Sequence, residues 1–487
     1  MLIEPKARHF IHSTSDPKSQ VLTRLRSLPW DRRHEGPYPL QVTGVGNATS
    51  IEPVPETGRV LGAFDTGLLW GNLGVSLLVV VSGAILVPAL SLGEAAAAIA
   101  LGCLVGNIML ASAAAIGAQA GVPGMVLLRA PLGSRGSILP TAINVLQCLG
   151  WTTFELIVIA AAAGALSEDL LGFEARWAWA LLFGALALVL GLLGPVAVVR
   201  GILRRFGAWL VLVALGYLTW WAFQDVSLAE VWRRDGEGGL SVWQGADLVV
   251  GLTVSWVPLV ADYSRYCRSP RSAFLGVGVG YGLAGAWMLG LGVVLVLSRG
   301  LGDAAELPPA VVGGGLVAAF ALLALTVAET DEAFANAYSG AVSLQNLTPG
   351  TSRRLLVVGT TGLGTVGALV LDLVSYQSFL LLLGSVFVPL FAVLVADWLA
   401  AGRRYTRDDL FAAPPLRPGP LAAWAFGFLL YQWLYPTGPV WWIDQVERLQ
   451  PPSWGIPVTF PSFLATLALA LPLARRSRRA AAGTVRP

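Results

Sequence analysis

The sequence predicts an all-α polytopic membrane protein with twelve transmembrane helices. Of its 487 residues, 55% are hydrophobic and only 13% are charged, and the mean hydropathy is +0.68. A water-soluble surface needs roughly a quarter of its residues charged, so this much apolar surface must face lipid. Stretches such as 71–90, 177–199 and 379–396 carry few or no charges and run for about 20 residues, the length that a helix needs to cross the hydrocarbon core. Their Leu, Ala and Gly content favours helices over barrel strands.

The hydropathy pattern predicts twelve helices after a polar N-terminal segment, residues 1–60. The expected ranges are 63–91, 94–120, 137–165, 177–200, 205–225, 242–267, 274–298, 311–343, 353–375, 376–400, 418–436 and 457–474. Lys and Arg in short loops resist translocation and therefore mark cytoplasmic loops. With the N-terminus inside, the only ones of the 32 basic residues placed outside are Arg176, Arg233, Arg234, Arg299 and Arg448. We therefore expect both termini in the cytoplasm of a bacterial-type inner membrane.

Composition and motifs argue against an enzyme or a nucleic-acid-binding protein. The chain has neither a GxxxxGK[ST] loop nor an HExxH helix, and its three histidines lie in the polar N-terminal segment. The three cysteines have no paired spacing and are interpreted as small apolar core residues. The net charge of +3 is spread over helix ends and forms no basic patch with interleaved aromatics. A channel needs a recurring filter motif, which the sequence lacks, so it remains a remote alternative to secondary transport.

Several acidic residues lie inside the predicted helices. Ionisable groups are costly in lipid and usually face a cavity or one another. The deep ones are Glu155, Asp262, Glu329, Asp331 and Glu332. Asp397 lies instead at the end of its helix beside Arg403 and Arg404, where an interfacial ion pair is favoured over a role in transport.

Two of the predicted helices contain signals for an internal break. The signals are Ser82, Gly83 and Pro88 in the first helix, and Thr253, Ser255 and Pro258 in the sixth. A proline removes a backbone donor and clashes with the preceding turn. Two broken helices that lie five helices apart in the order of the chain are typical of two inverted five-helix repeats. The backbone groups freed at such breaks bind ligands. The alternative is a pair of simple kinks, which are common in membrane helices.

One face of the third helix carries groups suited to a planar heterocycle. Gln147, Trp151 and Glu155 recur every four residues and therefore share this face. An indole offers a flat surface for stacking, and a glutamine offers both a donor and an acceptor. The alternative for Trp151 is a packing or interfacial role.

Three motifs resemble the nucleobase:cation symporter-1 family. They are NVLQCLGW (144–151), SWVPLVADYSRY (255–266) and TDEAFANAYSGAVSLQNL (330–347), and the resemblance covers roughly residues 60–435. It implies a leucine-transporter-type fold, with helices 1–5 and 6–10 as inverted repeats. The expected organisation is a cytoplasmic tail at 1–60, a transport core at 61–400, peripheral helices 11 and 12 at 401–474 and a basic cytoplasmic tail at 475–487.

The resemblance also implies where substrate binds. In the family, substrate lies between helices 1, 3, 6 and 8, stacked on aromatic rings and bonded by amides. Position by position, this implies Gln147 and Trp151 on helix 3, Ser255 and Trp256 at the helix 6 break, and Asn336 on helix 8. The helix 8 contact could equally be Glu332, one turn earlier.

The coupling ion is expected to be sodium or a proton, with no other cofactor. The resemblance implies a cation site that joins carbonyls near Ser82 and Gly83 to hydroxyls of Thr326 and Thr330. Sodium prefers hard oxygen ligands. Sodium-dependent members of the family usually carry a neighbouring hydroxyl pair, whereas Val327 and Ala328 follow Thr326 here. A proton carried by one of the carboxylates at positions 155, 329, 331 or 332 is an equal alternative.

The motifs look closest to the cytosine and hydroxymethylpyrimidine branches of the family. Purine, allantoin and hydantoin permeases are the alternatives, because side chains at three or four positions decide among such ligands. The expected partners are a small heterocycle, the coupling cation and the lipid bilayer. We expect a monomer that binds no nucleic acid.

Overall fold

Helices make up nearly all of the chain that the structure describes. The computed structural model describes residues 51–224, 227–299, 315–371, 376–449 and 457–483. Most of the predicted N-terminal tail, residues 1–50, therefore lies outside the described residues. Within the described ranges, the one β contact is an isolated bridge between Leu61 and Cys267.

The first half of the helical bundle follows a short 3-10 turn. Its elements are η1 (Glu56–Gly58), α2 (Ala63–Leu73), α3 (Leu77–Ala84), α4 (Leu92–Ala120), α5 (Gly124–Leu127), α6 (Arg129–Leu132), α7 (Ile138–Leu171), α8 (Arg176–Leu193), α9 (Pro195–Val198), the π-helical η2 (Val199–Gly207) and α10 (Ala208–Phe223). Local sequence explains the ends of the longest helices. Ser91 and Glu94 form a capping box at the start of α4, and Gly121 ends it with a φ of 72°.

The second half repeats the alternation of short and long helices. Its elements are α11 (Leu228–Trp232), α12 (Val242–Val254), α13 (Val260–Ser264), α14 (Pro270–Arg299), α16 (Leu316–Leu347), α17 (Arg353–Val370), α18 (Tyr376–Ala400), α19 (Arg407–Phe411), α20 (Pro418–Leu434), α21 (Val440–Glu447) and α22 (Thr459–Gly483). Each of the twelve predicted ranges contains one long helix or a broken pair. The all-helical prediction is therefore confirmed.

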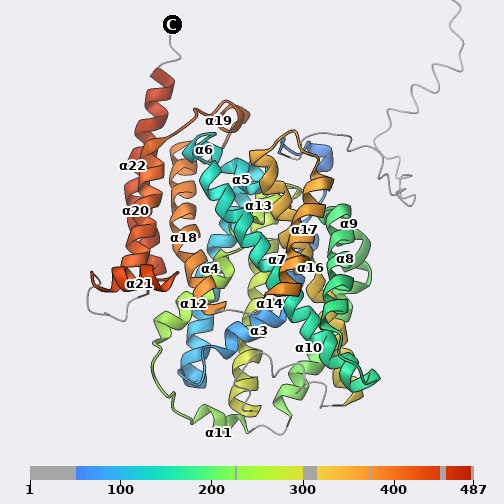
Figure 1. Cartoon of the computed structure of the whole chain (residues 1–487). Coiled ribbons are helices and arrows are strands. Elements are labelled where there is room, and N and C mark those ends of the chain that lie inside the picture. The colour runs from blue at the N-terminus through green and yellow to red at the C-terminus, as the bar shows by residue number, and fades with distance from the viewer. Residues whose placement is uncertain (1–50, 225–226, 300–314, 372–375, 450–456, 484–487) are drawn as a thin grey trace, which may run out of the picture. The chain divides into compact units, whose positions relative to one another are not determined.

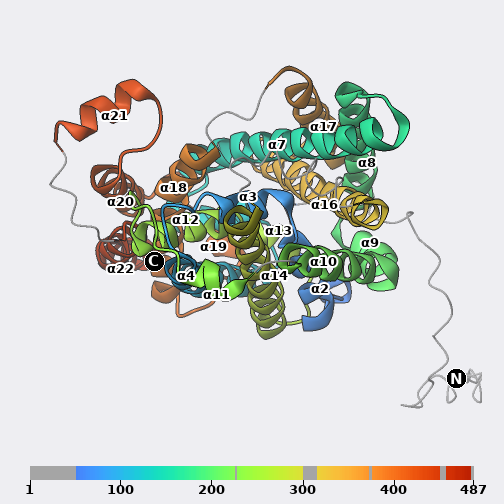
Figure 2. The same ribbon diagram turned by 90° about the horizontal axis from the view of Figure 1, so that it is seen from below.

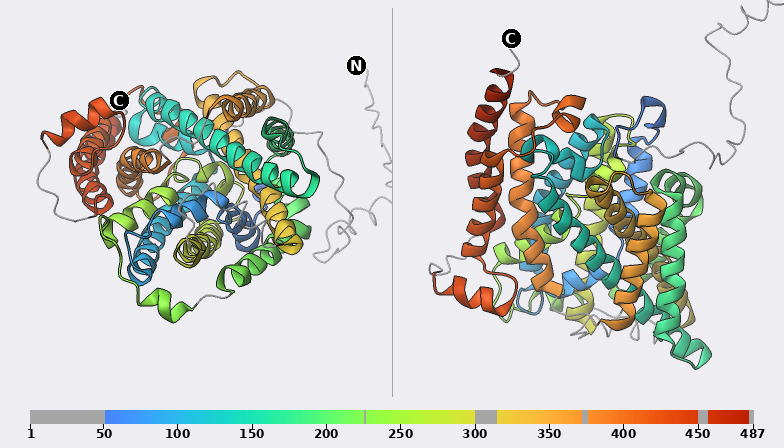
Figure 3. Two further views of the ribbon diagram at one scale, coloured as in Figure 1. Left: turned by 60° about the horizontal axis from the view of Figure 1, so that its bottom comes forward. Right: turned by 45° about the horizontal axis from the view of Figure 1, so that its top comes forward.

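Two short helices, α3 and α13, lie in the middle of the bundle, and longer helices surround them. Figure 2 shows α3 and α13 at the centre, with α7 and α16 running side by side. The helix α14 packs against α2, α3 and α4, and α12 packs against α4 (Figure 1). At the edge, α22 packs against α18 and α20 (Figure 3). The centre of the bundle is therefore formed by α3 and α13, which belong to the two predicted helices that contain break signals.

Six helices are long and apolar enough to cross a membrane by length and composition alone. In the described part of the chain these are α4, α7, α8, the continuous α9 to α10 segment, α14 and α18, and the bent pair α2 and α3 gives a seventh. The helix α16 is 32 residues long but carries Glu329, Asp331 and Glu332, which lowers its hydropathy. The total of twelve spans and the inverted repeat stay predictions.

The break predicted in the sixth helix is confirmed. The helix α12 ends at Val254 and α13 begins at Val260. Pro258 has no N–H for the carbonyl of Val254, which accepts instead from Val257 N at 2.9 Å in a tighter turn. Residues 255–259 are called the α12–α13 break below.

The break in the first helix lies elsewhere than predicted. The chain bends by 60° between α2 and α3, at residues 74–76. Ser82 and Gly83 lie inside α3, where the Ser82 hydroxyl donates to Leu78 O at 2.9 Å. Gly83 is needed for close packing, because a Cβ there would lie 2.0 Å from the carbonyl oxygen of Leu289 in α14. The prediction of a break at Ser82 and Gly83 was therefore wrong.

The last helix is held at both ends by buried aspartates. Asp247 of α12 accepts from the main-chain amides of Val458 and Thr459, at the start of α22. Near the other end of α22, Arg478 donates to Asp397 of α18 from Nε at 3.0 Å and from Nη2 at 2.6 Å.

Asp397 forms the ion pair that the sequence suggested, but with different partners. It binds Arg417 at 3.4 Å and Arg478 at 2.6 Å. The prediction of Arg403 and Arg404 as its partners was wrong, because the chain turns away at Gly402, which has a φ of 72°. The carboxyl is fully buried, and Tyr405 also donates to it at 3.0 Å.

Candidate functional site

The α12–α13 break exposes a backbone carbonyl to α7. Gln147 donates from Nε2 to the main-chain oxygen of Ser255 at 3.0 Å. The same nitrogen donates to Asn144 Oδ1 at 2.8 Å, and Asn144 donates to Ser343 Oγ of α16 at 2.9 Å. The predicted site residues Gln147 and Ser255 are therefore in direct contact. The hydroxyl of Ser255 points away, since it donates to Leu252 O at 2.6 Å within its own helix.

Trp151 belongs to an aromatic cluster on the α7 side of the site. Its ring lies 5.3 Å from that of Phe379 in α18 and 6.5 Å from that of Phe154, centroid to centroid. Both contacts are edge-to-face, with interplanar angles of 68° and 87°, an arrangement that fixes the indole in orientation. The side chain is only 5% exposed.

Trp256 belongs to a second cluster, on the α2 side of the break. Its ring centroid lies 5.6 Å from that of Trp70 and 6.3 Å from that of Tyr281. Trp70 also meets Tyr263 of α13 edge-on at 6.0 Å. The two predicted tryptophans are thus held by different neighbours on different sides of α12 and α13.

The acidic residues of α16 lie against the α2–α3 bend. Glu329 accepts from Ser76 Oγ at 2.7 Å and from Leu77 N, which lies 3.0 Å from both carboxylate oxygens. Asp331 accepts from Asn72 Nδ2 at 2.6 Å. The amide of Leu77 is free for this contact because it begins α3, and the positive end of a helix favours a carboxylate. The bend in the first helix is therefore anchored to α16.

Two further carboxyl groups lie next to this anchor, and three of their four oxygens have no donor among the described residues. Glu155 of α7 faces both Glu329 and Glu332. It is fully buried, and no N–H or hydroxyl group of the described residues reaches either of its oxygens. The Oε1 atom of Glu332 is likewise without a donor in that part of the chain. Three carboxyl groups from two helices thus share one buried region.

The remaining predicted residues of α16 differ in their hydrogen bonds. Thr326 donates its hydroxyl to Leu322 O at 2.8 Å, and Asn336 donates to Glu332 O at 3.1 Å. Both bonds lie within α16. The Thr330 hydroxyl is buried and has no hydrogen-bond partner among the described residues. No group of three or more His, Cys, Asp or Glu side chains in the described ranges is arranged to hold a metal ion.

Comparisons with known proteins identify the family of the chain. Residues 53–415 match the family described as permease for cytosine/purines, uracil, thiamine, allantoin. This match covers most of the chain. The chain belongs to the nucleobase:cation symporter-1 family. It is therefore a transporter and not an enzyme, and it is a multi-pass membrane protein.

Curated relatives of this chain are similar at modest identity. A hydantoin permease of Microbacterium maritypicum is 26% identical over 228 residues, which cover 46% of each chain. A cytosine permease of Escherichia coli is 26% identical over 358 residues, or 70% of this chain and 79% of the relative. The chain thus spans about half the length of the hydantoin permease and more of the cytosine permease.

Two solved transporter structures have a fold similar to that of this chain. The transporter Mhp1, in a closed conformation with bromovinylhydantoin bound, superposes with a TM-score of 0.75 at 20% identity, covering 89% of this chain and 96% of that one. A Na+-coupled sialic acid symporter gives a TM-score of 0.58 at 10% identity, covering 86% and 91%. Mhp1 is a nucleobase-cation-symport-1 family transporter, which agrees with the family match.

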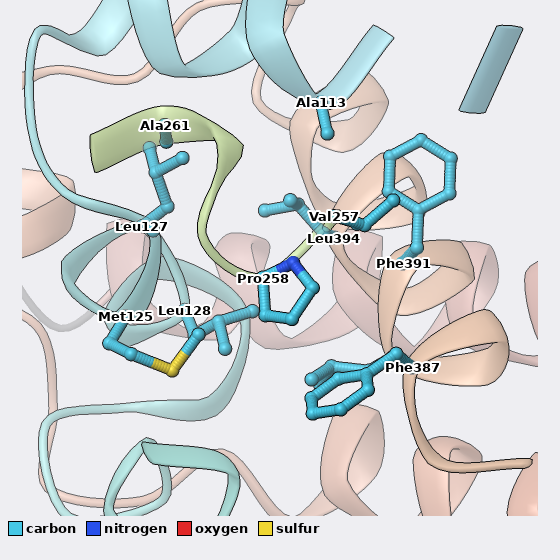
Figure 4. Close-up of a pocket in the computed structure, with 12 residues that line it drawn as sticks. Ala113, Met125, Leu127, Leu128, Val257, Pro258, Ala261, Phe387, Phe391 and Leu394 are labelled. Atoms are coloured by element: carbon cyan, nitrogen blue, oxygen red, sulfur yellow. The ribbon is translucent and has the colours of Figure 1, made fainter. Parts of the chain in front are cut away.

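A small apolar pocket lies beside the α12–α13 break and is not lined by the polar residues of the candidate site. Pro258 and Val257 face Met125 and Leu128 across it, with Phe387 of α18 on the far side (Figure 4). Its twelve lining residues are all apolar and include none of the predicted site residues. It offers space beside the break but no polar group for a heterocycle.

Several residues of the site were missed by sequence reasoning. Asn144, Ser76, Asn72, Trp70 and Phe379 were not singled out for a role. Ser76 had a recognisable signal, since a serine before an apolar run is a typical N-cap. Phe379 and Trp70 had none, because their contacts join segments far apart in the sequence.

Proposed function

We propose that this chain is a secondary active symporter that imports a nucleobase or a related pyrimidine-like heterocycle of the cytosine or hydroxymethylpyrimidine type. The observation that carries this proposal is the Gln147 amide bonded to the Ser255 carbonyl at the α12–α13 break, one turn from Trp151. Residues 147 and 151 lie about 6 Å apart along α7. A planar ring stacked on Trp151 would present its edge to Gln147.

Trp256 and the helix 8 residues would complete the site. In this proposal Ser255 contributes its backbone, Trp256 a second aromatic surface, and Asn336 or Glu332 a polar contact from α16. All of these side chains are at most 6% exposed in this conformation. Substrate would therefore enter when α7 and the α12–α13 break separate, as alternating access requires.

We propose a proton as the coupling ion. Glu155, Glu329 and Glu332 share one buried region, and three buried carboxylates in contact cannot all be ionised without a compensating positive charge. Shared protons provide that charge without a metal site. Sodium remains the alternative, for which carbonyls near Ser82 and Gly83 and the hydroxyls of Thr326 and Thr330 would supply oxygen ligands.

The proposed location is a bacterial inner membrane, with both termini in the cytoplasm and the protein acting as a monomer. The proposed orientation rests on the distribution of basic residues between alternate loops. Helices 1–10, up to residue 400, would carry out transport, while the last two helices would lie at the periphery.

Uptake by reconstituted vesicles tests the proposal. We expect saturable uptake of labelled cytosine or hydroxymethylpyrimidine that survives replacement of sodium by choline and falls when the proton gradient is collapsed. Uracil, hypoxanthine, allantoin and hydantoin in the same assay distinguish the other branches of the family. Strict sodium dependence would reject the proton, and fast flux that ignores the gradient would indicate a channel.

A further inference from the structure

Both N–H groups of the Gln147 side chain are already used within the protein. Nε2 lies 3.0 Å from the carbonyl oxygen of Ser255 and 2.8 Å from Asn144 Oδ1. A backbone carbonyl can only accept a hydrogen bond. The Ser255 carbonyl therefore requires nitrogen, and not oxygen, at this end of the Gln147 amide.

This requirement passes along the chain of contacts to α16. Because Gln147 presents N–H groups, Asn144 must face it with Oδ1, and its own Nδ2 then donates to Ser343 Oγ at 2.9 Å. Asn144 is fully buried and Ser343 is 1% exposed. The four groups form one directed relay across α16, α7 and the α12–α13 break. Reversing the Gln147 amide would bring two acceptors together at the Ser255 end, and reversing Asn144 alone would set two donors against each other.

One polar atom of Gln147 takes no part in this relay. Gln147 Oε1 is buried, in a side chain that is 2% exposed, and it has no hydrogen-bond partner among the described residues. A buried acceptor without a donor is destabilising, so such an atom in a native site indicates a missing partner. The partner it needs is a hydrogen-bond donor.

We infer that Gln147 offers substrate an acceptor only, and that Asn144 is the positioning residue that holds it in this state. The inference rests on the proposed function and deepens it. The substrate class is a heterocycle that presents an N–H group, from the ring or from an exocyclic amine, at the edge facing Gln147. An analogue with an acceptor or an apolar group at that edge is selected against.

Two pairs of analogues test the donor requirement on the purified full-length protein. Cytosine is compared with 4-methylpyrimidin-2-one, in which a methyl group replaces the amine, and hydantoin with 2,4-oxazolidinedione, in which oxygen replaces a ring N–H. We expect the donor-bearing member of at least one pair to bind about tenfold to a hundredfold more tightly. In Gln147→Met, which keeps the length but loses the acceptor, this ratio should fall close to one.

The outcomes separate this inference from the proposed function. Equal affinity within both pairs, or a ratio that persists in Gln147→Met, overturns the inference and leaves the proposed function standing. If the parent protein binds neither these four compounds nor hydroxymethylpyrimidine, the proposed function fails and the inference with it.

Substitutions of Asn144 test its positioning role. Asn144→Leu frees one N–H of Gln147 and lets the amide rotate, so the ratio within the pair should fall by about tenfold. Asn144→Asp keeps an acceptor toward Gln147 and can accept from the Ser343 hydroxyl, so it should retain the ratio. A residue with only a structural role would weaken both members of a pair equally, and that result in Asn144→Leu would overturn the assignment.

Discussion

The carboxylate of Glu329 accepts the main-chain amide of Leu77, which lies 3.0 Å from each of its oxygens. This contact joins α16 to the first residue of α3, at the bend that divides the first membrane helix. Ser76 adds a hydroxyl donor at 2.7 Å. A carboxylate at the positive end of a helix is favoured by the unpaired amides there. The bend is thus held by a residue that lies more than 250 positions later in the sequence.

Replacing Glu329 should loosen this junction. Glu329→Ala leaves the Ser76 hydroxyl and the Leu77 amide without their acceptor, and a buried donor left unpaired costs about 1 to 3 kcal/mol. We expect a lower unfolding temperature in detergent and a loss of transport. Glu168→Gln, at an exposed position of α7, is the matched control and should change neither. Equal stability of Glu329→Ala and the parent would contradict a role in holding the bend.

Replacing Trp151 should weaken substrate binding. Stacking of a base on an aromatic ring contributes roughly 1 to 3 kcal/mol, so Trp151→Ala should bind about tenfold to a hundredfold more weakly. Trp151→Phe keeps a flat ring and should lose less. Equilibrium binding to the purified variants measures both. Unchanged affinity in Trp151→Ala would make this residue part of the packing with Phe379, and Trp256 would become the centre of the site.

Neutralising Glu155 should separate substrate exchange from proton coupling. Glu155→Gln removes a titratable group from the buried carboxyl cluster but keeps its size. We expect counterflow of labelled substrate to persist in vesicles, while uptake driven by a pH gradient falls to the level seen without a gradient. Asp408→Asn, in a short helix outside the cluster, should behave like the parent. Gradient-driven uptake that survives in Glu155→Gln would exclude this carboxyl as the proton carrier.

Removing Arg478 should destabilise the protein by about 3 kcal/mol. Breaking a buried ion pair leaves an uncompensated charge and typically costs 3 to 5 kcal/mol. The lower end is expected because Arg417 remains 3.4 Å from Asp397. Arg479→Ala removes the neighbouring exposed arginine and should change stability by less than about 0.5 kcal/mol. Chemical unfolding of both variants measures the difference, and similar values for the two would refute the prediction.

A topology reporter tests the predicted orientation. The loops that the charge distribution places inside hold nearly all of the basic residues, so a reporter that is active only in the cytoplasm should be active when fused after Pro487. A fusion within the segment at Arg233 and Arg234 should be inactive. An inactive C-terminal fusion would contradict twelve spans with both termini in the cytoplasm.

Hydropathy was enough to locate the helices, and one proline was enough to locate one break. Pro258 predicted the α12–α13 break because a missing N–H acts on its own helix. The bend between α2 and α3 could not be found in this way. Its position coincides with the contact of Glu329 with Leu77, a tertiary contact that no local signal reveals, whereas Gly83 and Pro88 lie on either side of the end of α3 at Ala84.

The candidate site was predictable in part for the same reason. The spacing of Gln147 and Trp151 on one helical face was visible in the sequence. The direction of the Gln147 amide was not, because it depends on the Ser255 carbonyl of another helix as well as on Asn144. The partners of Asp397 were missed since Arg478 is 81 residues away along the chain, and sequence proximity favoured Arg403 and Arg404.

The attachment of α22 at both ends has a mechanical consequence. Asp247 fastens the beginning of α22 to α12, the helix that leads into the break, while Arg478 fastens its far end to Asp397 of α18. A rotation of α12 relative to α18 would therefore either drag α22 along or rupture one of these two fastenings. A helix at the edge of the bundle can in this way oppose the movement of the helices around the proposed substrate site. It would then limit the amplitude of that movement.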